Sequence, residues 1–218
     1  IVSIALANAR PGLERSLAAR CPAPVDVEWL EDLEGDRAVF GLRPSRSGPA
    51  EIDPRWLPPA GELDPEVQGG HILTDTGLKV TGWGAPEVTM ALATPLVVPV
   101  GGFFQVNRHL VPWLFRRVAE LAGADPTPVW DLHAGVGFLA AAARHAAPRE
   151  LVLAEPFRPA ARAAARNLPE ARIAVGRTAE SLLARHRKLP RHALVLTDPP
   201  RSGFTPTLRS RLAGWHPE

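Results

Sequence analysis

The feature that most restricts the fold is a regular alternation in the second half of the chain. Four short apolar runs, each the length of a buried strand, are separated by stretches with helical character. The runs are Val129–Leu132, Leu151–Ala154, Arg172–Val175 and Ala193–Thr197. Strands that alternate with helices at this spacing form a parallel sheet, because parallel neighbours need a long crossover between them. The sequence therefore predicts an α/β domain with helices on both faces of its sheet.

The first hundred residues predict a smaller, mixed unit. A short apolar run covers Val2–Asn8, and Pro11–Arg20 has helical character with Pro in its first turn. The segment Pro44–Gln68 is rich in Pro, Gly and acidic residues, which predicts a surface loop or linker. Strand-like stretches lie at Val25–Leu33, Arg37–Leu42, His71–Thr74, Leu78–Trp83 and Val88–Val100.

The pattern of apolar residues changes at Gly101-Gly102, and this change divides the chain. After it, His109–Leu121 carries apolar residues at helical spacing, and the alternating runs follow. We therefore expect two domains. Residues 1–100 would form an α+β domain with a Pro-rich loop at about 44–68, and residues 101–218 would form the α/β domain.

Composition limits the kinds of protein that this chain can be. No run reaches the roughly 18 apolar residues that a membrane helix needs. The chain begins with Ile and shows no signal-peptide pattern, so we expect a start upstream of Ile1. Cys21 is the only cysteine, which excludes an intrachain disulfide and fits the cytoplasm. Lys79 and Lys188 are the only lysines; the remaining basic residues are Arg, whose planar donors suit phosphate and weakly favour a nucleic-acid partner.

Three features of the second half lie where a nucleotide-type cofactor site needs them. The stretch Asp131–Gly137 follows a strand and precedes a helix, and its glycines allow a sharp turn close to a ligand. Glu155 ends the next strand, where an acid can accept hydrogen bonds from ribose hydroxyls. Asp198, followed by two prolines and Arg201, ends the fourth strand at the ligand-binding edge of such sheets. Each feature alone is common, but together and in this order they predict a cofactor site.

Four segments carry a resemblance to a known family. They are FFQVN (103–107), DLHAGVG (131–137), LAEPFRPAARAAARN (153–167) and TDPPRSGF (197–204). Together they resemble the RNA uracil-5-methyltransferases, which use S-adenosylmethionine to modify ribosomal and transfer RNA. FFQVN is the most specific segment. The resemblance implies a class I methyltransferase (Rossmann-like) domain, a preceding domain that faces the RNA, and a cytoplasmic, monomeric enzyme.

The resemblance also implies a set of roles. Gln105, Asp131, Gly135 and Gly137 would surround the methionine end of the cofactor, and Asn107 would be structural. His133 and Phe138 would line the pocket, Glu155 would hold the ribose, the turn 177–179 would lie near the adenine, and Asp198 would lie near the transferred methyl group.

The chain departs from the family pattern at two places in the glycine stretch. The family usually has Tyr or Phe followed by Cys where this chain has His133-Ala134, and a polar residue where it has Phe138. Both changes are compatible with binding but alter how the cofactor packs. We interpret His133 as part of the pocket lining rather than as a general base.

The reaction of the family needs a nucleophile that we do not find in this chain. A Cys thiolate adds to carbon 6 of uracil, carbon 5 takes the methyl group, and a carboxylate base then removes the carbon 5 proton. In the family both groups follow the DPPR segment, so we expect them after Glu218, in a longer protein. Cys21 precedes Pro22, with no His or Lys close in sequence to activate it, and is expected to be an inert thiol.

Three alternatives remain open at this stage. A methyltransferase acting on amino groups would normally have an aromatic residue where this chain has Arg201. A non-catalytic RNA-binding module could retain the fold without the chemistry. A dinucleotide-dependent enzyme is disfavoured because the third glycine of its pattern is missing.

Overall fold

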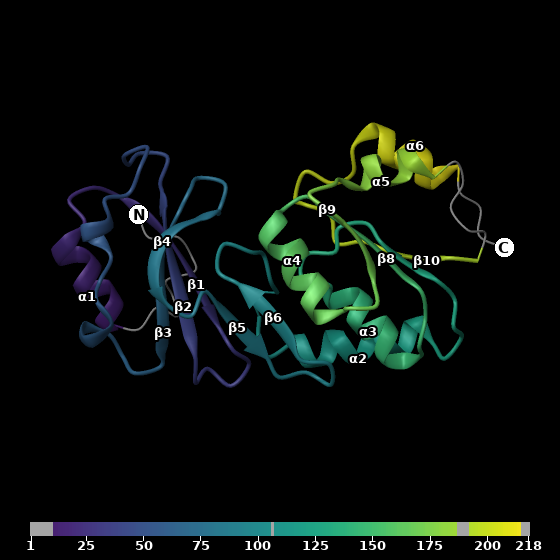
Figure 1. The fold of residues 1–218 in the computed structure, drawn as a ribbon, viewed down its shortest axis with the longest axis horizontal. Helices are drawn as coiled ribbons and strands as arrows, with labels where there is room; N and C mark the ends of the chain where they lie inside the picture. The colour runs from purple at the N-terminus through teal and green to yellow at the C-terminus, as the bar shows by residue number, and fades with distance from the viewer. Residues whose placement is uncertain (1–10, 106, 187–191, 215–218) are drawn as a thin grey trace. The chain divides into compact units, whose positions relative to one another are not determined.

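The computed structural model describes residues 11–105, 107–186 and 192–214 (Figure 1). The chain forms two compact units, which are described one at a time. Unit 1 comprises Ile1–Met90 with Val98–Gly102, and unit 2 comprises Ala91–Val97 with Phe103–Glu218. The apolar run predicted at Val2–Asn8 lies outside the described residues. Within the described part of the chain, no helix is long and apolar enough to cross a membrane.

Unit 1 contains a four-stranded sheet in the order β1-β2-β3-β4. The β1–β2 and β3–β4 pairs are antiparallel, whereas β2 and β3 are parallel. Helix α1 (Pro11–Arg20) buries Leu13 and Leu17 in the core of this unit. The strands are β1 (Val25–Glu31), β2 (Ala38–Pro44), β3 (Val67–Leu73) and β4 (Lys79–Gly84).

The Pro-rich segment between β2 and β3 is an irregular connection in which Ile52 and Pro58 are buried and the other residues are exposed or half-buried. It is the crossover that two parallel strands require, and it contains two single-turn 3-10 helices, Pro54–Trp56 and Ala60–Glu62. Ile52 is buried in the core, and Trp56, Leu57 and Leu63 pack against the same core. Composition alone does not predict these core contacts, because apolar residues placed singly between prolines have no strand or helix period, yet they still bury apolar surface.

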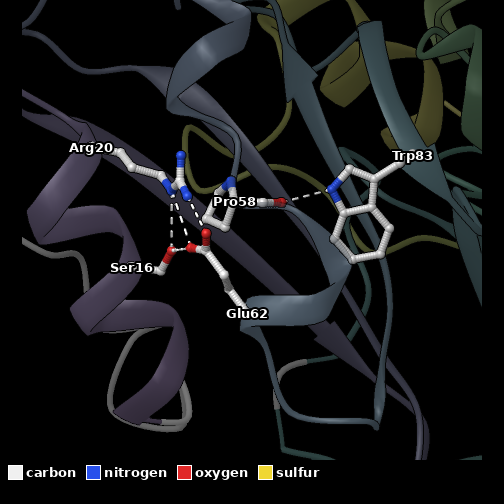
Figure 2. Close-up of polar contacts among 5 residues, drawn as sticks. All are labelled: Ser16, Arg20, Pro58, Glu62 and Trp83. Carbon is white, nitrogen blue, oxygen red and sulfur yellow. Dashed lines mark hydrogen bonds and ion pairs between the residues drawn. The ribbon is translucent and has the colours of Figure 1, made fainter.

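Hydrogen bonds join the same crossover to β4 and to α1 (Figure 2). Trp83 of β4 donates a hydrogen bond from its indole Nε1 to the carbonyl oxygen of Pro58 over 2.8 Å. Glu62 accepts hydrogen bonds from Ser16 and Arg20 of α1. The Glu62 contacts are exposed and therefore weak, whereas the Trp83 contact is half-buried.

Replacing Trp83 with Phe is expected to lower the free energy of unfolding by about 1–2 kcal/mol. Phe keeps the edge-to-face contact with Phe40, at 6.3 Å between ring centroids, but leaves the Pro58 carbonyl without its donor. Urea denaturation measures the change, and Glu62→Ala serves as a control with an expected effect below about 1 kcal/mol. A Trp83→Phe protein as stable as the wild type would contradict this role of the indole N–H.

The predicted strand Val88–Val100 is interrupted in the structure. Strand β5 (Glu87–Met90) and strand β6 (Leu96–Pro99) pair with each other in a two-stranded sheet. Pro95 lies in the connection, and because proline has no N–H to give to a sheet, the strand does not continue through it.

Unit 2 is built on a parallel sheet in the order β10-β7-β8-β9. The strands are β7 (Val129–Asp131), β8 (Leu151–Glu155), β9 (Arg172–Val175) and β10 (Leu194–Leu196). The helices are α2 (Val111–Ala122), α3 (Phe138–Ala146), α4 (Arg158–Asn167), α5 (Ala179–Arg185) and α6 (Pro206–Ala213). The predicted α/β fold with a parallel sheet is confirmed, and each strand lies within about a residue of its predicted run.

Helices cover both faces of the sheet (Figure 1). Helices α3 and α4 bury their alanines, which allow the helix backbone to approach the strands closely. Helices α5 and α6 pack Leu182, Leu183 and Leu208 against the opposite face. The chain moves outward from β7 to β9 and then returns to the other side of β7, where β10 pairs with it. With the right-handed crossovers that parallel strands favour, this reversal places the helices on opposite faces.

The return of the chain creates a point where the strand order reverses. It lies between β7 and β10, which pair in parallel from Val129 opposite Leu194 to Asp131 opposite Leu196. In open α/β sheets ligands bind outside the carboxyl ends of the strands at such a point. A ligand-binding site is therefore expected among the residues that follow β7, β8 and β10.

Candidate functional site

The loop between β7 and α3 has the backbone geometry of a ligand-binding turn. Gly135 and Gly137 both have left-handed φ values, 54° and 88°. A Cβ at Gly137 would lie 2.9 Å from Leu168 Cδ1, so this glycine allows close packing of the loop on the domain. A Cβ at Gly135 would meet no described atom within 4 Å, so the space beside Gly135 is open to a ligand.

These two glycines are expected to respond differently to alanine. Gly137→Ala should lower the free energy of unfolding by about 2–3 kcal/mol, because left-handed strain and the Leu168 contact add together. Gly135→Ala should cost only the strain, about 1 kcal/mol, while its methyl group enters the open space. Thermal and urea denaturation of the two variants measure the difference. Equal losses would contradict the different surroundings of the two glycines.

Asp131 is the most unusual side chain at this edge of the sheet. It is fully buried, and neither carboxylate oxygen has a hydrogen-bond partner of normal geometry among the described residues. Burial raises the pKa of Asp131 to about 7; the charges of Glu155 and Asp198 add to the increase, and the backbone N–H groups of His133 and Ala140 oppose it. A carboxyl group that is buried with only these weak backbone contacts favours a proton or a positively charged ligand.

Glu155 connects the glycine loop to the end of β8. Its Oε2 accepts a hydrogen bond from the Gly135 N–H over 2.8 Å, and its Oε1 accepts one from the Phe157 N–H over 2.7 Å. Burial raises the pKa of Glu155, while these two hydrogen bonds favour the charged form. Each oxygen keeps a further lone pair, so the carboxylate can also accept from hydroxyl groups of a ligand.

Gln105 and Asp198 come from distant parts of the sequence and meet at the same edge. Gln105 donates from Nε2 to Asp198 Oδ2 over 2.9 Å. The neighbouring Phe104 is buried edge-to-face against Phe138, with 5.5 Å between ring centroids, and thereby fixes the backbone next to Gln105. Phe138 also contacts Phe115, so its ring belongs to an aromatic cluster in the core of unit 2.

His133 lies in the glycine loop and contacts the segment that follows β10. Its Nδ1 is 2.7 Å from Thr197 Oγ1, and its ring stacks on Phe204 with 6.0 Å between centroids. Burial lowers the pKa of His133, and the charges of Glu180 and Asp198 oppose this. The imidazole is therefore neutral near pH 7.

The structure brings most of the predicted site residues to one edge of the sheet. Asp131 ends β7, His133 and Gly135 are in the glycine loop that follows, Glu155 bonds to that loop, and Gln105 bonds to Asp198. The turn 177–179 follows β9, whose neighbour β8 ends at Glu155. Asn107 accepts a hydrogen bond from the His109 N–H in the turn that precedes α2, which is a structural contact. Val106 of the FFQVN segment lies outside the described residues.

Cys21 belongs to unit 1 and packs against its core. Burial raises the pKa of its thiol, with the Arg20 charge opposing the effect, so the thiol is protonated near pH 7. Within the described residues, no group of three or more His, Cys, Asp or Glu side chains is placed to hold a metal ion.

Sequence reasoning missed Asn167, which supports the glycine loop from the end of α4. Its Nδ2 donates to the carbonyl oxygens of Val136, over 2.9 Å, and of Val97, over 3.1 Å. Its Oδ1 accepts from the Val97 N–H over 2.8 Å. A polar residue at the end of an alanine-rich helix is the only signal in the sequence, and it fits a helix terminus equally well.

No protein-family model and no curated protein matches this sequence. Several solved structures do match. The tRNA (uracil-54, C5)-methyltransferase of Pyrococcus abyssi, in complex with S-adenosyl-L-homocysteine, aligns with a TM-score of 0.67 and 17% identity, over 94% of this chain and 54% of that one. The chain has the fold of that enzyme. It spans about half the length of the archaeal protein.

Two other structures have lower scores. A SAM-dependent methyltransferase from Agrobacterium tumefaciens aligns with a TM-score of 0.45 and 17% identity, over 80% of this chain and 60% of that one. The tRNA m1G37 methyltransferase of M. jannaschii aligns with a TM-score of 0.41 and 15% identity, over 78% and 46%. The first match alone supports the fold of both units.

Proposed function

We propose that unit 2 binds S-adenosylmethionine, and that the protein to which this chain belongs methylates carbon 5 of uridine in ribosomal or transfer RNA. The observation that carries the proposal is the buried carboxyl group of Asp131, which has no hydrogen-bond partner of normal geometry among the described residues and lies at the end of β7 next to the open glycine loop. S-adenosylmethionine carries an ammonium group, a sulfonium centre and a ribose, and each has a suitable partner at this edge of the sheet.

The residues fit the parts of the cofactor one by one. Asp131 offers a carboxylate to the ammonium group, and ionic pairing would compensate its burial. Glu155 has lone pairs left for the ribose hydroxyls, and the space beside Gly135 admits the ligand. When bound, the cofactor supplies an electrophilic methyl group. The negative charges of Asp131, Glu155 and Asp198 suit its positive charge.

The finer assignment, carbon 5 of uridine, rests on the FFQVN and DPPR segments and on the fold shared with the archaeal enzyme. The structure joins these segments through the Gln105–Asp198 hydrogen bond. We assign the nucleophilic Cys and the base of such a reaction to no residue of this chain. RNA as the partner, a monomeric state and a cytoplasmic location are parts of the same proposal.

Two experiments test the two parts of the proposal. Isothermal titration of the chain with S-adenosylhomocysteine should give 1:1 binding with a dissociation constant in the micromolar range. Absence of binding by the folded chain would overturn the cofactor assignment. Incubation of the whole gene product with methyl-labelled cofactor and unmodified transfer or ribosomal RNA should then yield 5-methyluridine; a labelled base of another kind would refute the uridine assignment.

A further inference from the structure

The segment from Thr197 to Thr205 leaves the sheet at β10 and returns to it at the start of α6. Thr205 caps α6 by accepting from the Leu208 N–H, and its hydroxyl donates to Glu180 Oε1 over 2.6 Å. Between these ends lie Asp198, the two prolines and Arg201, all at or near the surface. We call residues 197–205 the DPPR loop.

One side chain outside the DPPR loop contacts it near both of its ends. His133 Nδ1 is 2.7 Å from Thr197 Oγ1, at the first residue of the loop. The face of the same imidazole lies on Phe204, the last residue but one, with an interplanar angle of 18°. The His133–Thr197 contact joins residues 64 positions apart, across the point where the strand order reverses.

An imidazole is well suited to make both contacts. Its ring nitrogen reaches the hydroxyl in the plane of the ring, while its flat face remains available for stacking. A phenyl ring at this position keeps the face and loses the nitrogen. An asparagine keeps a polar atom near the position of Nδ1 and loses the face.

We propose that His133 is a positioning residue that fixes the DPPR loop against the glycine loop, and so sets the place of Asp198 relative to the cofactor pocket. The inference rests on the proposed function for the reaction that the loop serves, but the contacts themselves do not depend on it. The charged groups that face the imidazole are Glu180 and Asp198. Gln105 holds Asp198 from the other side, so the carboxylate of Asp198 is located by the loop backbone and by one amide.

The test compares three substitutions of His133 in the full chain. His133→Ala removes both contacts, His133→Phe keeps the stack, and His133→Asn keeps the polar contact. Hydrogen exchange of the Gly203 amide, which donates to the Pro200 carbonyl oxygen within the loop over 2.7 Å, is followed by mass spectrometry. We expect exchange about tenfold to a hundredfold faster in His133→Ala, and about tenfold faster or less in each single-contact variant. The exposed His192→Asn is the matched control and should leave exchange of the loop unchanged.

Two further measurements separate positioning from a merely structural role. The melting temperature should change little in His133→Phe and His133→Asn. Because His133 is expected to line the pocket, the dissociation constant of S-adenosylhomocysteine should change by less than kcat does. With RNA, kcat of the whole gene product should fall about tenfold or more while KM changes less. Unchanged exchange of the loop in His133→Ala would overturn the inference, as would single-contact variants that lose stability and cofactor affinity in parallel.

Failure of the proposed function gives a different result. If the wild-type chain binds no S-adenosylhomocysteine while the loop still exchanges faster in His133→Ala, the proposed function is wrong and the positioning of the loop by His133 is supported.

Discussion

Replacing Asp131 with Asn is expected to stabilise the ligand-free protein at pH 8 by about 2 kcal/mol and to weaken binding of S-adenosylhomocysteine by a hundredfold or more. At pH 8 the wild type holds a buried charge that lacks a hydrogen-bond partner of normal geometry among the described residues. Asn removes that charge at nearly constant volume, although its amide still lacks good partners. The same change removes the carboxylate that we propose for the ammonium group of the cofactor.

The raised pKa of Asp131 determines whether the free energy of unfolding rises or falls with pH. Between about pH 4 and pH 7 the folded protein keeps a proton on Asp131 that the unfolded chain has lost, since the pKa rises from 3.8 to about 7. The folded state then binds more protons than the unfolded state, so the free energy of unfolding falls as pH rises through this window. A shift of about three units corresponds to roughly 4 kcal/mol at most. The wild type should lose this stability on going from pH 4 to pH 7, and Asp131→Asn should not.

Ligand binding should show the opposite trend, because the cofactor needs the ionised carboxylate. The affinity for S-adenosylhomocysteine is expected to rise up to about tenfold per pH unit from pH 5 to pH 7 and then to level off. Urea denaturation and titration calorimetry across this range measure both trends. A variant that is less stable than the wild type at pH 8 would contradict the account.

Asp32→Asn is the matched control for these measurements. Asp32 is also a buried aspartate, but its Oδ1 accepts hydrogen bonds from the backbone N–H groups of Gly35, Asp36 and Arg37. An amide at this position is a weaker acceptor than a carboxylate, so Asp32→Asn should lose stability at pH 8 where Asp131→Asn gains it. Both variants shifting in the same direction would show that the presence or absence of hydrogen-bond partners does not decide the sign.

The site could be predicted from the sequence where its residues follow directly from strands. Asp131, Glu155 and Asp198 each come just after or at the end of an apolar run, and parallel strands bring such residues to one edge. The two glycines could be recognised because a strand-to-helix turn needs left-handed backbone. Local patterns of this kind are visible in one sequence.

Contacts made over long sequence separations could not be predicted. The link from His133 to Thr197 spans 64 residues, and the links from Asn167 to Val97 span 70. Neither partner belongs to a periodic pattern, since a single polar side chain in a loop or at a helix end has many uses. The burial of Ile52 in the Pro-rich crossover was missed for the same reason. The core contacts of Ile52 depend on the position of the sheet of unit 1. The sequence of the Pro-rich segment does not specify that position.

Among residues outside the cofactor pocket, Asn167 is expected to be the one whose replacement damages the pocket most. Asn167→Ala removes the partner of the Val97 N–H and of the Val97 and Val136 carbonyl oxygens, all half-buried contacts. Leaving such groups without partners costs about 1–3 kcal/mol each when water cannot replace the side chain, so we expect a loss of about 3–5 kcal/mol. Val136 lies between the two glycines of the loop, and binding of S-adenosylhomocysteine should weaken at least about tenfold.

Asn167→Asp tests the donor contacts of Asn167 while keeping the volume of its side chain. The aspartate can still accept from the Val97 N–H, but it points its second oxygen at two carbonyl oxygens that need a donor. At pH 8 it should therefore be at least as unstable as Asn167→Ala, and it should recover part of its stability near pH 4, where a protonated carboxyl group can donate once. Arg162→Ala, an exposed change on the same helix, should leave both stability and binding within error of the wild type. An Asn167→Asp protein more stable than Asn167→Ala at pH 8 would mean that the donor contacts to Val136 and Val97 do not support the glycine loop.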